Sequence, residues 1–440
     1  MELKYFLKHS IVPIIKKCLA HKHKWPFVPN ENEFKIRQIL IAGGYGYSNA
    51  GDEAQCNATA NLLTKFFPNY QLKILSPNPD NTFLKHQFAS EYASRVAFWG
   101  QSQAINLYDF KESKIEKALF LLRGVQVLLS ALLMKHKLPT FFLGGSATKL
   151  LQEIKSSSLF FFSGGGFLTG KTLSRLWDGI FVCKICEIFN IPVVMSGQTI
   201  GVWGNEFNKK FASWGFKKVK IITSRDVEYT VKALQELDIE AKIYETHDDA
   251  LFCEKSEESF YNGDYITINF HSWGTNSAEK DLVQERFHQI VQKLPYKCVF
   301  LPMVGGNELD FKEYDKNFPN EIEMFEGDFD FRKIRKVIAD SKLCITMKHH
   351  PIIFAYGEDI PAISIVHSDY YYHKNKGAQA QYGQEDCNIM LNDPDFMKKF
   401  ETILEKTLNN KECIETIKTS KEVLRKQKEN FIEDVKKVLE

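Results

Sequence analysis

Hydrophobic positions in the first half of the chain come in short runs, each followed by a stretch with apolar residues at helical spacing. Short runs rich in β-branched and aromatic residues predict strands, and the longer periodic stretches predict helices. This alternation is typical of a parallel sheet that helices cover on both faces. The predicted strands are residues 38–42, 71–75, 159–162, 192–195 and 219–223.

The same alternation begins again near Gly263, with strands predicted at 265–270, 298–301, 343–346 and 362–366. The pattern therefore predicts an α/β protein with two Rossmann-like domains that face each other across a cleft. The expected divisions are an N-terminal segment 1–35, a first domain 36–255, a second domain 256–392 and C-terminal helices 393–440 that pack back on the body. Those helices carry an apolar stripe of Phe400, Leu404, Leu408, Val423, Phe431, Val435 and Val438.

Residues 1–25 combine an apolar stripe with six lysines, a pattern that fits peripheral contact with an anionic membrane surface. Pro13 interrupts the stripe, and a helix packed on the first domain explains the pattern equally well, so both interpretations stay open. The stretch 114–137 is long and apolar, but Arg123, Gln126 and Ser130 are interspersed. We therefore predict a buried or interdomain helix there rather than a membrane span.

Composition excludes several classes of function. The net charge of the 440 residues is +2, which offers no basic excess for nucleic acid. Nine cysteines without a disulfide-dense pattern indicate a reducing compartment. Cys183 and Cys186 lie in an apolar helical pattern and are expected in a core, so no metal site or cofactor is predicted. No export signal is seen, and we expect a cytoplasmic protein, with the inner face of the membrane as the location if residues 1–25 bind it.

The first predicted strand ends in a glycine-rich loop that contains Gly44 and Asn49 and leads into a helix. Asp52 is expected to cap that helix, with Gln55 completing a capping box. Asp52 and Glu53 place two carboxylates at the positive end of the helix dipole, which disfavours a phosphate and favours a sugar polyol. One carboxylate is also suited to take a proton from an attacking hydroxyl. The alternative is that Asp52 only caps and Glu53 is only a first-turn acid.

Other candidate residues also follow predicted strands. They are Gly164, Gly165 and Gly166; Gln198 and Gly201; Arg225; and, in the second half, Lys348, His350 and Lys374. Ligands of open parallel sheets bind outside the carboxyl ends of the strands. The loops of the first half are therefore expected to form one wall of the cleft.

Several of these motifs, in this order, resemble those of the polysaccharide pyruvyl transferases. The likeness begins with the Gly-Tyr-Gly-x-x-Asn-x-Gly-Asp-Glu stretch at 44–53 and covers about residues 38–385. It continues through the glycines at 164–166, Gln198 with Ile200-Gly201, Ser224-Arg225-Asp226, Asp249-Ala250-Leu251-Phe252, Lys348-His349-His350 with Phe354-Ala355, and Tyr371-Tyr372-His373-Lys374.

The resemblance implies a GT-B arrangement and transfer of an enolpyruvyl unit from phosphoenolpyruvate onto two sugar hydroxyls as a ketal. It also implies that Arg225 binds the donor and that His350 is catalytic. Two positions depart from the family: Lys348-His349-His350 stands where Arg-Leu-His is usual, and Gly201-Val202 stands where Gly-Pro is usual. Lysine keeps the charge of the arginine but loses its bidentate geometry.

The chemistry favours the same residues. Ketal formation needs a proton donor for the methylene carbon of phosphoenolpyruvate, which suits a histidine, and cations for the donor's carboxylate and phosphate, which suit Arg225, Lys348 and Lys374. The alternative for His349 and His350 is a pair of helix-start histidines, one buried and one exposed. The predicted acceptor is a sugar of a cell-surface glycan or of its lipid-linked precursor.

Two other functions stay open. One is a nucleotide-sugar glycosyltransferase in which Lys348 and Lys374 neutralise a leaving diphosphate, and the other is a catalytically silent glycan-binding relative. The sequence carries no signal for the oligomeric state.

Overall fold

The computed structural model describes residues 37–46, 49–92, 114–138, 145–227, 229–271, 277–304 and 322–440, so the predicted segment 1–25 lies outside it. Its first sheet is parallel throughout, in the order β3-β2-β1-β4-β6-β7-β8, with β5 paired to β6. The strands are β1 (Gln38–Ala42), β2 (Gln71–Ser76), β3 (Ser90–Tyr92), β4 (Leu159–Phe162), β5 (Gly165–Thr169), β6 (Val193–Gly201), β7 (Ile221–Ser224) and β8 (Lys242–Glu245).

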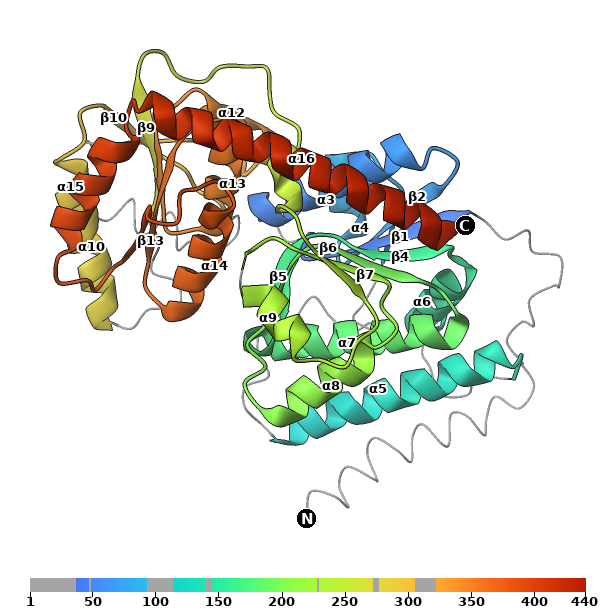
Figure 1. Cartoon of the computed structure of the whole chain (residues 1–440). Coiled ribbons are helices and arrows are strands. Elements are labelled where there is room, and N and C mark those ends of the chain that lie inside the picture. The colour runs from blue at the N-terminus through green and yellow to red at the C-terminus, as the bar shows by residue number, and fades with distance from the viewer. Residues whose placement is uncertain are drawn as a thin grey trace.

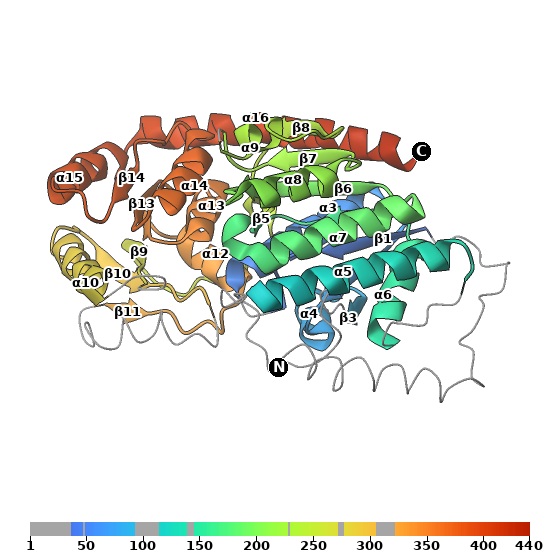
Figure 2. The ribbon, with the colours of Figure 1, turned by 90° about the horizontal axis from the view of Figure 1, so that it is seen from below.

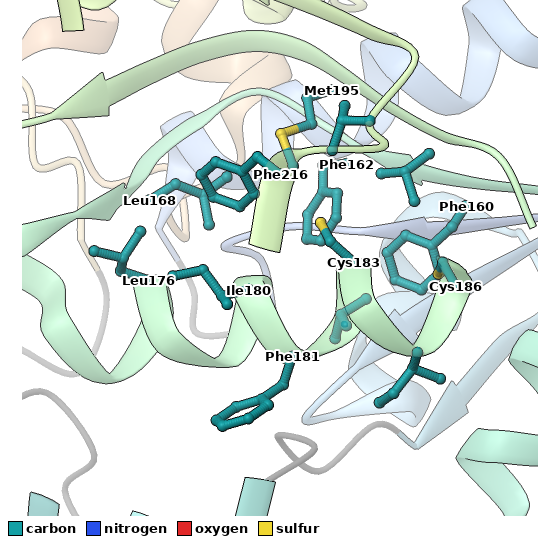
Figure 3. Packing of buried hydrophobic residues seen from close by; sticks show 14 of the residues in the cluster. Phe160, Phe162, Leu168, Leu176, Ile180, Phe181, Cys183, Cys186, Met195 and Phe216 are labelled. Carbon is teal, nitrogen blue, oxygen red and sulfur yellow. The ribbon is translucent and has the colours of Figure 1, made fainter. Parts of the chain in front are cut away.

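Helices cover both faces of this sheet (Figure 1). They are α3 (Ala50–Phe66), α4 (Pro79–His86), α5 (Lys114–Lys135), α6 (Gly145–Ser156), α7 (Leu173–Phe189), α8 (Glu206–Phe216) and α9 (Tyr229–Gln235), with short 3₁₀ turns η2 (Gly170–Thr172) and η3 (Asp249–Phe252). Figure 3 shows one core layer, in which Phe162 of β4 lies over Cys183 of α7 and Phe160 lies next to Cys186. Cys183 and Cys186 are buried here, as expected, and the described residues hold no cluster of metal-ligating side chains.

The second sheet is also parallel, in the order β11-β10-β9-β12-β13-β14. Its strands are β9 (Tyr265–Asn269), β10 (Lys297–Phe300), β11 (Glu323–Met324), β12 (Cys344–Thr346), β13 (Ala362–Val366) and β14 (Asn388–Met390). The helices of this part are α10 (Ser277–Val291), α12 (Phe331–Ala339), α13 (His349–Gly357), α14 (Asp369–Ala380), α15 (Phe396–Thr407) and α16 (Lys411–Leu439). Two parallel sheets of this kind confirm the predicted α/β fold with two Rossmann-like domains.

The last helix, α16, runs from the second sheet back across the first (Figure 1). Phe431, Ile432 and Val435 are fully buried there, against residues of β1 and β4. The predicted stripe was wrong at Val423, which is 53% exposed, because the buried side of the helix turns through Leu424 and Lys428 instead. The apolar pattern did not reveal this face because one of its buried residues, Lys428, is charged.

The prediction of a buried or interdomain helix at 114–137 was also wrong. Helix α5 lies on the outer side of α7 (Figure 2), and only one face of it is covered. Gly124 allows that contact, since a β-carbon there would lie 1.9 Å from Cζ of Phe181. Leu122 and Leu129 on the opposite face are 63% and 56% exposed. A helix that is apolar on all sides does not reveal from its sequence which side the fold will cover.

The glycine-rich loops after two strands of the first sheet are shorter than predicted. β6 runs on to Gly201, and β5 begins at Gly165 and pairs with it, so Gln198 and Gly166 lie in strands rather than in loops. The sequence suggested loops because glycine weakens a strand. Here the glycines leave room for side chains that approach the sheet edge from the helices.

Candidate active site

The start of α3 differs from the prediction. Asn49, not Asp52, caps the helix: its side-chain oxygen accepts a hydrogen bond from the Gly51 amide at 3.1 Å. The preceding amide, that of Ala50, donates to the carbonyl of Met303 in the second domain at 3.0 Å. Gln55 completes no capping box, because its amide donates to both carboxylate oxygens of Asp248, at 3.0 and 2.9 Å. The helix begins earlier than predicted, which leaves Asp52 and Gln55 available to the site.

Glu53 lies in a structural network. The side chain is 1% exposed; it meets Nε2 of His86 at 2.7 Å and accepts from the Gly46 amide at 3.0 Å. Burial acts to raise the pKa of Glu53, but the His86 hydrogen bond and the Lys85 charge lower it overall. These contacts hold α4 and the loop before α3 together. They fit the structural alternative for Glu53, whose catalytic role stays a prediction.

Asp52 points to a different environment. Burial raises the pKa of this carboxyl group to about 6, against the charges of Arg175, Arg225 and Lys374. With this pKa, both the protonated and the charged form of Asp52 are populated near neutral pH. Such a carboxyl group is suited to exchange a proton with a bound ligand. Arg175, near the start of α7, was not predicted from the sequence.

Asp248 lies at the centre of the site and was also missed. It is fully buried, forms an ion pair with Arg225 and meets Nε2 of His349 at 3.3 Å. Burial acts to raise its pKa, but Arg225 and His349 hold it well below its ordinary value. Arg225 is fixed further by a hydrogen bond from Nε to the Thr199 hydroxyl, at 2.8 Å. The sequence signal was faint: Asp248 directly precedes the 249–252 motif.

Three donor groups converge on Gly166. A β-carbon on this glycine would lie 3.0 Å from Nη2 of Arg225, 3.5 Å from the Tyr370 hydroxyl and 3.6 Å from Nζ of Lys374. Nη2 of Arg225 is buried and has no hydrogen-bond partner among the described residues. Burial, with the Arg225 charge second, lowers the pKa of Lys374 to about 7. A buried guanidinium nitrogen without a partner, next to two further donor groups, suits an anionic ligand.

His350 approaches the same cluster from the second domain. It lies in the first turn of α13, where Nε2 is 4.0 Å from Oδ2 of Asp248 and has no hydrogen-bond partner among the described residues. Burial, aided by the charges of Arg225 and Lys374, keeps the pKa of this imidazole well below its ordinary value, although Asp248 opposes the shift. The His350 side chain is 13% exposed.

His349 is the buried member of the histidine pair. Its ring nitrogens meet Asp248 and, at 3.2 Å, the side-chain oxygen of Asn375. Burial and the Arg225 charge lower its pKa to about 3. We infer that His349 supports the position of Asp248, whereas His350 faces the cations.

The remaining predicted residues lie around this cluster. Lys348 acts electrostatically on the buried His271 at the end of β9, and Gln198 donates to the backbone carbonyl of Ser163 at 2.6 Å. The Gly164 amide donates to Asp249 at 2.9 Å, and Gly201 adopts a positive φ of 130°. Gly44 lies against Asp52, since a β-carbon there would be 3.2 Å from its Cγ.

A second buried carboxylate, Asp249, connects the site to the C-terminal helix. It accepts hydrogen bonds from Ser196 at 2.7 Å and from Nζ of Lys428 at 2.5 Å, and Lys428 also donates to Ser196 at 2.6 Å. Lys428 could not be found from the sequence, because it is one of many lysines in a charged helix.

Comparison with curated proteins finds no match. Among solved structures, the chain is similar to a putative UDP-N-acetylglucosamine 2-epimerase from Listeria monocytogenes, with 12% identity, coverage of 87% of this chain and 90% of the other, and a TM-score of 0.55. It is also similar to an S. aureus MnaA–UDP co-structure, with 7% identity, coverage of 87% of this chain and 90% of the other, and a TM-score of 0.53. A third similar structure is a glycosyltransferase from Rickettsia africae ESF-5, with 10% identity, coverage of 92% of this chain and 100% of the other, and a TM-score of 0.52.

At these identities the structural likeness establishes the fold alone, a GT-B-like pair of domains. The family model described as polysaccharide pyruvyl transferase matches residues 49–369, which include Asp52, Gly166, Arg225, Asp248 and His350. The chain belongs to the polysaccharide pyruvyl transferase family.

Proposed function

We propose that the protein transfers a pyruvyl group from phosphoenolpyruvate to two hydroxyls of a sugar in a polysaccharide or its lipid-linked precursor. The observation that carries this proposal is the convergence of Arg225, Lys374 and Tyr370 on Gly166, with His350 beside them. Family membership supports a polysaccharide-modifying transferase. The donor, the acceptor and the residue roles below are the proposal.

Arg225 and Lys374 bind the negative charge of the donor. Arg225 offers a buried, unpaired Nη2 whose position is fixed by Asp248 and Thr199, so little reorganisation is needed when an anion arrives. Lys374, with a pKa near 7, is partly protonated at neutral pH, and a bound anion favours its charged form. The Tyr370 hydroxyl supplies a further donor at the same point.

His350 delivers the proton that starts the reaction. Its imidazole is neutral without ligand, and the negative charge of a bound phosphate raises its pKa, so protonation follows donor binding. The proton adds to the methylene carbon, and the adjacent carbon becomes electron-deficient and is attacked by the first sugar hydroxyl. Asp52 takes the proton of that hydroxyl.

The second half of the reaction releases phosphate and closes the ketal. The carbon–oxygen bond to phosphate breaks, the second hydroxyl attacks the same carbon, and its proton leaves with the phosphate. The two hydroxyl protons therefore balance the one gained by the methyl group and the one gained by the phosphate, with Asp52 and His350 exchanging a proton between turnovers.

Phosphate release in the presence of phosphoenolpyruvate and candidate glycan acceptors tests the proposal. We expect release that depends on the acceptor, and we expect phosphoenolpyruvate to raise the melting temperature. Two of the similar structures are a putative UDP-N-acetylglucosamine 2-epimerase and a complex with UDP, which makes a nucleotide-sugar donor the alternative to test. Stabilisation by a nucleotide sugar but not by phosphoenolpyruvate would contradict the pyruvyl proposal. Binding of glycan without turnover of either donor would support a catalytically silent protein.

A further inference from the structure

The outer face of α5 is apolar, exposed and regular. Ile115, Leu122, Val125, Leu129 and Leu132 are separated by seven, three, four and three residues, which places them on one helix face, and they are between 42% and 63% exposed. The last four of these residues, with Leu138, border a groove of about 530 Å³ whose lining is almost entirely apolar. An apolar patch of this extent on a protein surface marks an interaction site.

Neighbouring aromatic residues extend this face. Helix α8 also packs on the outer side of α7 (Figure 1), and its Phe207 and Trp214 are 52% and 42% exposed. Phe211 of α8 contacts Phe181 of α7, whose ring also meets Phe120 of α5, so the two helices are neighbours across α7. Tryptophan and phenylalanine are enriched where proteins meet the membrane–water boundary.

The charges at the two ends of α5 decide between possible occupants. Lys114 and Lys117 lie at its start and Lys135 and Lys137 at its end, against the single acid Glu116. A second copy of the chain would place lysines against lysines in either orientation of the two helices. The lysine-rich segment 1–25, outside the described residues, carries the same sign of charge. An anionic surface is complementary to both ends at once.

We propose that the outer face of α5, with Phe207 and Trp214 beside it, docks on the surface of an anionic phospholipid membrane. The helix is about 33 Å long at 1.5 Å per residue, and it lies flat with its leucines below the headgroups. The lysines at both ends reach the headgroup phosphates while their methylene stems stay apolar.

Helix α5 is, among the described residues, the one helix long and apolar enough to cross a membrane. Its inner face, however, packs through Gly124 on Phe181, and Phe120, Val127 and Ala131 are buried. A spanning helix would have to break this contact. The docking face is therefore a peripheral one, and it does not depend on the reaction proposed above.

Vesicle flotation with the full-length protein tests the proposal. We expect binding to phosphatidylcholine vesicles that contain phosphatidylglycerol, weaker binding to phosphatidylcholine alone, and a decline with salt as the charges are screened. The double variant Leu122→Ser/Leu129→Ser should lower the bound fraction at least about tenfold, because two leucines no longer enter the bilayer. Both side chains are exposed, so the melting temperature should hold. The triple variant Lys114→Gln/Lys117→Gln/Lys135→Gln should remove most of the preference for anionic lipid.

Leu84→Ser/Val423→Ser is the matched control, since these residues are 71% and 53% exposed on α4 and α16, away from this face. It should bind vesicles as the wild type does. Unchanged binding of the α5 leucine variant, or equal loss in the control, would overturn the proposal. So would a wild-type dimer that the leucine variant converts to a monomer without any vesicle binding. If the wild type does not bind vesicles and the leucine variant has a lower melting temperature, another part of the same chain covers this face, and the proposal is wrong.

Discussion

The imidazole of His350 lies directly against Gly51, so that a β-carbon on residue 51 would be 1.8 Å from Nδ1 of the ring. Gly51 belongs to the first turn of α3 in the first domain, and His350 to the first turn of α13 in the second. The approach of the two domains at the site is therefore set by the absence of one side chain.

Gly51→Ala should displace His350 and lower turnover by about 10- to 100-fold, because a small misplacement of a catalytic group costs this much. Phosphoenolpyruvate affinity should stay within a few-fold, since Arg225 and Lys374 are untouched. Phosphate-release kinetics and a thermal-shift titration measure the two effects.

His350→Ala should abolish turnover and leave donor affinity within a few-fold, because the interaction is made in the transition state. The double variant Gly51→Ala/His350→Ala removes the clash and should melt close to the His350→Ala protein. His373→Ala, an exposed histidine on α14, is the control and should keep full activity. Full activity in His350→Ala would remove this residue from the mechanism.

Donor affinity should fall as the pH rises through about 7. Lys374 has its pKa lowered to about 7 by burial, so it loses its charge above that pH and attracts the anion less. Lys374→Arg should keep the affinity high across the range, because arginine stays protonated. Titrations of phosphoenolpyruvate between pH 6 and 9 measure this. The ionisation of the donor itself is common to both proteins, so a decline of the same size in Lys374→Arg would contradict the assignment.

Asp52→Asn and Glu53→Gln should affect different properties although the residues are adjacent: the first should affect turnover and the second stability. Asp52→Asn should lower turnover by about 10²- to 10⁴-fold with little change in melting temperature, because Asn49 supplies the helix cap. Glu53→Gln should instead destabilise the fold by about 1–3 kcal/mol, because it disturbs the buried contact with His86. Urea unfolding and phosphate release distinguish the two. An active Asp52→Asn enzyme would rule out Asp52 as the base.

Lys348 tests how far this chain follows its family. If it binds the donor, Lys348→Ala should weaken phosphoenolpyruvate binding by about 1.5–3 kcal/mol through loss of a charged hydrogen bond. Lys348→Arg restores the residue usual in the family and should preserve or raise activity. Donor titrations and turnover of both variants check this. An Ala variant with unchanged affinity would leave Lys348 outside the site, beside His271.

Lys428→Met should destabilise the protein by about 3–5 kcal/mol, because it leaves the buried Asp249 without its cation. Lys426→Met, on the exposed side of the same helix, should be nearly neutral. Denaturant unfolding gives both values. Asp249→Asn in the Lys428→Met background should recover part of the loss, and a further loss of equal size would show that the two residues act independently.

The sequence predicted the fold because the spacing of apolar residues shows which positions of a strand or helix are buried. This spacing can be recognised within each short stretch of the chain. It predicted Asp52, Arg225, Lys374 and His350 as members of one site because each lies close to the carboxyl end of a strand. It did not reveal Asp248, because a place directly before the 249–252 motif is too faint a signal to distinguish this residue from other acids. Nor could it decide between Asp52 and Glu53, because adjacent helical residues point about 100° apart and the direction depends on the partner domain.

Residues 431–435 have a consequence for synthesis of the chain. Ile41 and Phe161 of the first sheet are covered by Phe431, Ile432 and Val435, which the ribosome adds about 270 residues after β4. Until then α3 covers only part of this side of the sheet, and nascent chains with an uncovered apolar surface are prone to aggregate. The protein is therefore expected to need chaperone protection until α16 has been made, although the strands of its first sheet are complete by residue 245.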